Sequence, residues 1–221
     1  MLVVCIVAFT YPLLNSTLFF LFDKGVRPRS FAPGEVSFWF YLAIIIELVS
    51  LLLLVYILRR QGRSLRHLTL SCSWKDLPES LALAIGAYIV FALSYALFFY
   101  IYYFVTGRTL NAAPQNVEFL RTKITLAAVL LMLVNPFYEE LIARAYIMTE
   151  VQFLTGSRLL ALCASVALQS AYHLYQGVAS ASMLSVLFTI FSVYFLMRRK
   201  ILPVILAHMY FDFLALLSYA R

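Results

Sequence analysis

The chain has 221 residues, of which 64% are hydrophobic and 12% charged, and its formal net charge is +7. Soluble domains usually contain about 45–50% apolar and about 25% charged residues, so this composition argues against a soluble enzyme or nucleic-acid-binding module. The three cysteines form no CxxC pair, which argues against a disulfide scaffold. We therefore expect an all-α, polytopic transmembrane helix bundle, because lipid offers no hydrogen-bond partner to open backbone groups.

Seven apolar runs approach or exceed the length of about 20 residues that a bilayer-spanning helix needs. In chain order they cover residues 2–21, 37–58, 79–104, 124–149, 159–177, 182–197 and 201–220. The first run lacks a basic n-region and a small-residue cleavage site, so we interpret it as a span rather than a signal peptide. The sequence thus predicts about seven spans.

Basic residues between these runs indicate how the bundle is oriented. Segment 59–78 contains Arg59, Arg60, Arg63, Arg66 and Lys75, and the turn before the last run contains Arg198, Arg199 and Lys200. The positive-inside rule places both segments on the cytoplasmic side. The two assignments agree, because the four runs between the segments, an even number, return the chain to the same side. We expect a multi-pass protein of the cell membrane, in contact with lipid and without a nucleic-acid partner.

Several ionisable residues lie inside the apolar runs, where they are costly and usually mark a functional site. The set is Glu47, Glu139, Glu140, Arg144, His173, His208 and Asp212. Glu140 and Arg144 are four residues apart, so they share a helix face and can pair. Glu139 lies about 100° around the helix from Glu140 and can face another partner.

The two histidines complete this inventory. Asp212 follows His208 by four residues, so its carboxylate can fix the tautomer of the imidazole. His173 stands alone on its helix, where an interhelical hydrogen bond is the alternative to a catalytic role. A purely structural ion pair is likewise the alternative for Glu140 and Arg144. Carboxylates and histidines on three helices nevertheless favour an active site.

The order of these residues narrows the chemistry. The sequence has no H-E-x-x-H zinc motif, no G-x-S-G serine motif and no G-x-G-D aspartyl motif. It contains E-E-x-x-x-R from Glu139 to Arg144, then His173, then H-x-x-x-D from His208 to Asp212. This order resembles the CPBP intramembrane proteases, the family of CAAX prenyl endopeptidases and bacteriocin-processing proteins also called Abi.

The resemblance covers about residues 120–220. The first and third motifs match the family pattern, whereas Gln169 stands where the second motif, F-x-x-x-H, has an aromatic residue. We therefore expect residues 1–119 to form N-terminal transmembrane helices and residues 120–221 to form a CPBP-like catalytic core.

The resemblance implies an endopeptidase that cuts a peptide, or a prenylated or membrane-proximal protein, near the cytoplasmic membrane face. It implies that Glu139 is the general base for water. The residues expected to assist, by supporting this base, holding the water and stabilising the oxyanion, are Glu140, Arg144, His173, His208 and Asp212.

Metal dependence stays open at this stage. The family has also been regarded as metallopeptidases, and His173, His208 and Glu139 could bind Zn²⁺ with an open fourth position. No compact ligand motif is present, so we favour metal-free chemistry with zinc as the alternative. Two other functions also stay open: a non-enzymatic immunity or scaffold protein that retains the site, and a small transporter.

Overall fold

The computed structural model describes residues 2–22, 34–109 and 124–219, and every regular element within these ranges is helical. The α-helices are α1 (Leu2–Phe22), α2 (Glu35–Arg60), α3 (Asp76–Thr106), α4 (Leu126–Glu139), α5 (Ile147–Thr155), α6 (Arg158–Tyr172), α7 (Val178–Arg198) and α8 (Leu202–Tyr219). A π-helical segment, η3 (Glu140–Tyr146), joins α4 to α5, and two 3-10 turns are η1 (Leu65–Leu68) and η4 (Leu174–Gln176). The expected all-α bundle is confirmed.

Six helical segments of the described chain are long and apolar enough to cross a membrane. They are α1, α2, α3, the continuous helix Leu126–Thr155, α7 and α8. The remaining predicted run, 159–177, corresponds to α6, which has only 15 residues. The described structure thus has six candidate spans, where the sequence predicted about seven. α6 is shorter than the apolar run because it ends at Tyr172 and a 3-10 turn follows.

Local sequence explains where several helices begin and end. The side chains of Thr125 and Ser157 each accept a hydrogen bond from the backbone N–H three residues later, which caps the N-termini of α4 and α6. Gly107 and Gly156 follow α3 and α5 with φ angles of +66° and +71°, a left-handed conformation that favours glycine. These caps place helix ends where the apolar runs stop.

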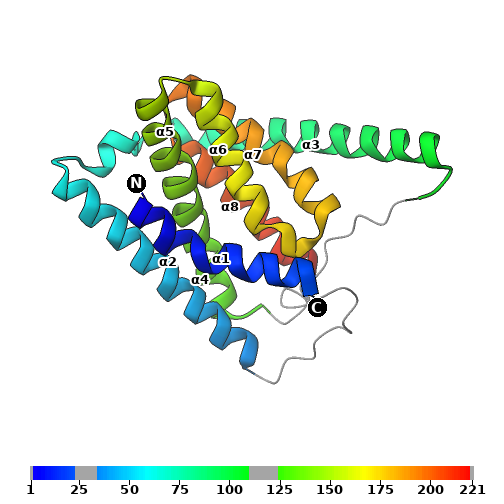
Figure 1. Cartoon of the computed structure of the whole chain (residues 1–221), viewed down its shortest axis with the longest axis horizontal. Helices are drawn as coiled ribbons and strands as arrows, with labels where there is room; N and C mark the ends of the chain where they lie inside the picture. The colour runs from blue at the N-terminus through cyan, green and yellow to red at the C-terminus, as the bar shows by residue number, and fades with distance from the viewer. Residues whose placement is uncertain (1, 23–33, 110–123, 220–221) are drawn as a thin grey trace.

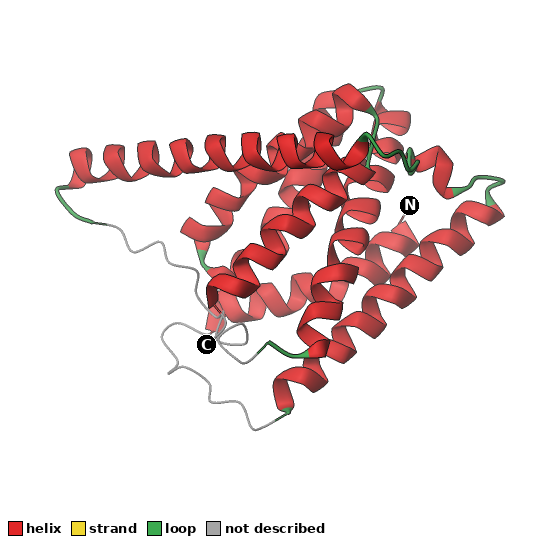
Figure 2. Cartoon of the chain, turned by 180° about the vertical axis from the view of Figure 1, so that it is seen from behind, coloured by secondary structure: helices red, strands yellow, loops and turns green. Residues whose placement is uncertain are grey.

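The continuous helix formed by α4, η3 and α5 passes through the middle of the bundle (Figure 1). Its α4 part packs against α2 and α8, η3 contacts α1, α6 and α7, and α5 packs against α6. Helix α3 packs on α7 and α8, and its C-terminal end extends beyond the other helices in both views (Figures 1 and 2). The residues of η3 are thus surrounded by other helices.

The two basic segments meet at one end of the bundle. Arg63 pairs with Glu150 at 2.5 Å, and Arg199 donates a hydrogen bond to Gln152, so both segments contact α5. This contact confirms that they lie on the same side of the bundle, as their charge predicted. Which membrane face this end occupies stays a prediction.

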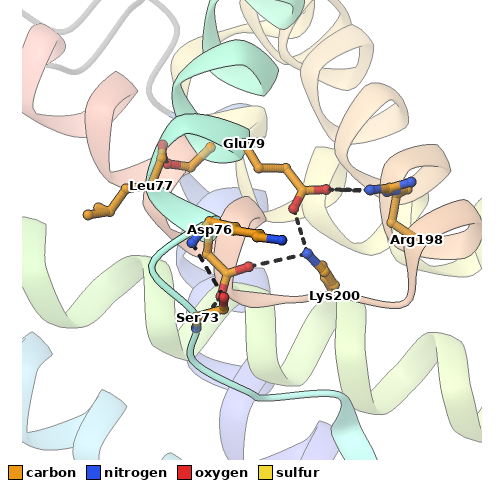
Figure 3. Close-up of polar contacts among 8 residues, drawn as sticks. Ser73, Asp76, Leu77, Glu79, Arg198 and Lys200 are labelled. Atoms are coloured by element: carbon orange, nitrogen blue, oxygen red, sulfur yellow. Dashed lines mark hydrogen bonds and ion pairs between the residues drawn. The ribbon is translucent and has the colours of Figure 1, made fainter.

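The same end contains an ion-pair network between α3 and the turn that joins α7 to α8 (Figure 3). Glu79 accepts from Lys200 at 2.6 Å and from Arg198 at 3.2 Å, and Lys200 also lies 3.4 Å from Asp76. The hydrogen bond with Glu79 raises the pKa of the Lys200 ammonium, which therefore stays charged at neutral pH. The network fixes the start of α3 beside the start of α8.

Thiol labelling of intact cells tests the predicted orientation. Cys72 is exposed in the basic segment, and Arg108 is exposed just beyond the other end of α3. With Cys5 and Cys163 replaced by alanine, we expect Cys72 to be protected from a membrane-impermeant reagent. In the same background without Cys72, Arg108→Cys should react. Labelling of both positions from the same side would contradict a spanning α3.

Candidate active site

The two adjacent glutamates lie where the central helix changes its geometry. Glu139 is the last residue of α4 and Glu140 is the first residue of the π-helical segment, and both are buried. Pro136, one turn earlier, has no backbone N–H to donate within α4. Short π-helical segments within α-helices frequently occur at functional sites. The sequence predicted a continuous helix here and did not reveal this segment.

Arg144 is fully buried, and its guanidinium has partners on three sides. It pairs with Glu140, donates Nη2–H to the Gln169 side-chain oxygen at 2.5 Å, and donates Nε–H to the Ser192 hydroxyl at 3.2 Å. The guanidinium also lies over the Phe191 ring, 5.5 Å from its centroid. A buried charge requires such pairing, because an unpaired one is strongly destabilising. The predicted pair between Glu140 and Arg144 is confirmed.

Besides its side-chain contact with Arg144, Gln169 contacts His173 through its backbone, which the family pattern did not reveal. Its backbone carbonyl lies 2.9 Å from Nδ1 of His173, the residue that follows α6. A carbonyl oxygen only accepts, so Nδ1 donates and Nε2 is the acceptor nitrogen of the neutral ring. The ring also packs against Tyr172 and Phe188, with centroids 4.6 and 5.1 Å away. Backbone and rings together fix the orientation of His173.

His208 on α8 connects the two glutamates to Asp212. Its Nδ1 lies 2.7 Å from Glu140 Oε1, while Nε2 lies 3.5 Å from Asp212 Oδ1 and 3.9 Å from Glu139 Oε2. Because Glu140 is ion-paired with Arg144 and accepts, Nδ1 carries the proton of this hydrogen bond. Glu140 therefore orients the imidazole through Nδ1, a contact that the sequence did not predict. Asp212 lies beside the opposite nitrogen.

One pocket of about 750 Å³ brings the motif residues together. Glu139, His173, His208 and Asp212 all line it, although they come from distant parts of the sequence. Glu140 and Arg144 are fully buried and do not line the pocket. Glu140 instead contacts a residue that lines it, His208.

The rest of the pocket wall is mainly apolar and aromatic, and its polar side chains include Glu47 and Asn135, which sequence reasoning did not assign to the site. Glu47 from α2 lines it, and Asn135 from α4 places Nδ2 3.5 Å from Asp212 Oδ2. Glu47 carried one signal in the sequence, since it is the only ionisable residue inside its apolar run. Asn135 carried none beyond its position four residues before Glu139.

The residues expected to bind zinc do not form a metal site. Within residues 2–22, 34–109 and 124–219, no three histidine, cysteine, aspartate or glutamate side chains lie close enough together to hold a metal ion. His173, His208 and Glu139 share the pocket without forming such a group. The side chains therefore do not fit zinc, and we derive no chemical step through a metal.

Gln169→Leu tests the importance of the amide for Arg144. The change leaves a guanidinium N–H buried without its acceptor, so we expect a loss of about 1–3 kcal/mol in unfolding free energy. The matched control is Gln152→Leu, whose partner Arg199 is half-buried and can turn to water. Thermal unfolding of the purified proteins in detergent should show a clearly larger decrease for Gln169→Leu. Equal decreases would contradict a special role for Gln169.

Comparison with protein families identifies one match. Residues 121–214 match the family model described as type II CAAX prenyl endopeptidase Rce1-like. No curated protein and no solved structure matches the chain. The matched region begins before α4, ends within α8 and contains all six motif residues. Residues 121–214 are therefore similar to the Rce1-like type II CAAX prenyl endopeptidases, in agreement with the resemblance to CPBP proteases.

Proposed function

We propose that the protein is an intramembrane endopeptidase in which Glu139 activates water for attack on a peptide bond. The observation that supports this proposal best is that the two adjacent glutamates have different partners. Glu140 is occupied by Arg144 and by His208, whereas Glu139 lines the pocket and forms no ion pair with Arg144. A carboxylate with this freedom can accept a proton from water.

The contact between Glu139 and His208 supports the position of that water. A separation of 3.9 Å between Oε2 and Nε2 is too long for a direct hydrogen bond but allows one bridging water. In the proposed reaction, the water oxygen attacks the carbonyl carbon while its proton moves to Glu139. Glu139 then gives this proton to the leaving nitrogen as the C–N bond breaks.

The histidines have different proposed roles because their hydrogen bonds differ. His173 donates from Nδ1 to the Gln169 carbonyl, so its Nε2 can accept a hydrogen bond from the water, whose other proton moves to Glu139. His208 donates from Nδ1 to Glu140, so in its doubly protonated form Nε2–H remains for the developing oxyanion. Asp212, 3.5 Å from that nitrogen, supplies nearby negative charge for such a ring.

The substrate is proposed to be a peptide, or a prenylated or membrane-proximal protein, cut near the cytoplasmic face of the cell membrane. Three features support this proposal: the prenyl-endopeptidase family of residues 121–214, the six candidate spans, and the predominantly apolar and aromatic pocket wall. The basic end of the bundle supports the cytoplasmic orientation.

Glu139→Gln tests the proposed base. The amide keeps the shape of the side chain but cannot accept the proton, so we expect hydrolysis of a farnesylated CAAX peptide to decrease by roughly 10²-fold or more. Glu150→Gln is the matched control, because Glu150 lies on the same continuous helix and pairs with Arg63 away from the pocket. It should keep near wild-type turnover.

Turnover in the Glu139→Gln variant close to that of the wild type would show that Glu139 is not the base. Binding of the peptide to wild-type protein without any hydrolysis would instead favour the non-enzymatic alternative.

Removal of metal tests whether the reaction needs zinc. Because the described histidines and carboxylates form no metal-binding group, we expect hydrolysis to survive prolonged treatment with a chelator. Elemental analysis of the active protein should find no stoichiometric zinc. About one zinc per chain, lost together with activity in His208→Ala, would overturn the metal-free mechanism and leave the protease assignment standing.

A further inference from the structure

We propose that Glu47 forms a subsite in the catalytic pocket that binds a positively charged side chain, lysine or arginine, of the substrate. This inference rests on the proposed function because it names a substrate feature read by the same pocket. Glu47 lies on α2, outside the region that matches the endopeptidase family. The family match therefore says nothing about the role of Glu47.

The first argument is the state of the Glu47 side chain. The residue is only 8% exposed, and its Oε2 atom is buried without a hydrogen-bond partner. Glu47 also lines the catalytic pocket. A buried carboxyl group of this kind is either protonated or ionised beside a partner, and a cation in the pocket would stabilise its ionised form. The pocket is the available place for that partner.

The second argument is the charge of the pocket wall. Three carboxyl side chains line it, those of Glu47, Glu139 and Asp212. The only basic side chains among the described lining residues are two histidines, and no lysine or arginine lines the pocket. Arg144 does not neutralise these carboxyl groups, because it is fully buried outside the pocket lining and is paired with Glu140.

The third argument concerns the kind of cation that fits. No group of three potential ligands among the described residues is compact enough to hold a metal ion. The pocket itself, at about 750 Å³, is large, and most of its wall is apolar or aromatic. A lysine or arginine side chain matches both properties, since its aliphatic stem packs on apolar surface while its charged end reaches a carboxylate.

The test uses binding of fluorescent farnesylated octapeptides to the full-length protein in detergent, measured by anisotropy. One lysine is moved along an otherwise uncharged peptide and compared at each position with norleucine, which has a similar shape and no charge. At one or two neighbouring positions, lysine should bind about 10-fold or more tightly than norleucine. Glu47→Gln should abolish this difference, while Glu47→Asp should retain part of it.

Glu35→Gln, at the start of the same helix and away from the pocket lining, is the matched control and should bind like the wild type. Equal or weaker binding of lysine at every position would overturn the inference, as would an unchanged lysine preference in Glu47→Gln. Hydrolysis measured in the same samples separates the two proposals. A Glu47-dependent preference without hydrolysis would keep the cation subsite and reject the proposed proteolysis.

Discussion

The buried guanidinium of Arg144 is the interaction on which the geometry of the site depends. Its partners come from η3, α6 and α7, so one side chain connects three segments in the middle of the bundle. Glu140 extends this connection to His208 on α8. The neutralised pair does not touch the pocket, yet it determines which of the two adjacent glutamates remains available there. Removing any one partner would leave a charge or a strong donor buried without compensation.

This arrangement gives each member of the E-E-x-x-x-R motif a separate physical task. Arg144 and Glu140 neutralise each other, and Glu140 uses its other oxygen to orient an imidazole. Glu139 is then the member of this motif that lines the pocket. The division is possible because neighbouring residues on a helix point about 100° apart, so the carboxylates face different surroundings.

Local spacing explains which parts of the structure could be predicted from the sequence. Apolar runs predicted the helices because burial in lipid requires them, and the four-residue spacing predicted the pair between Glu140 and Arg144. Contacts between distant helices leave no such periodic signal. The hydrogen bond from His208 to Glu140 and the contacts of Gln169 and Ser192 therefore emerged only from the fold. The π-helical segment was also missed, because its residues have ordinary helical composition.

Gln169 illustrates why a departure from a family pattern can mislead. The amide stands where the family pattern has an aromatic ring. In the structure the side chain is fully buried, does not line the pocket and accepts from Arg144. The aromatic contacts of His173 come from Tyr172, Tyr175 and Phe188. The substitution therefore concerns how the buried charge is held.

The shortness of α6 has a consequence for the supply of water. Its 15 residues extend about 22 Å, less than the roughly 30 Å of a bilayer core, so α6 is too short to cross such a core by itself. Non-helical backbone is tolerated within such a core only where protein or a water-filled cavity surrounds it. The turn after α6, with His173, Tyr175 and Gln176, lines the catalytic pocket. In a hydrolase, the termination of α6 before His173 would therefore orient the His173 imidazole and keep a water-filled space for the reacting water beside it.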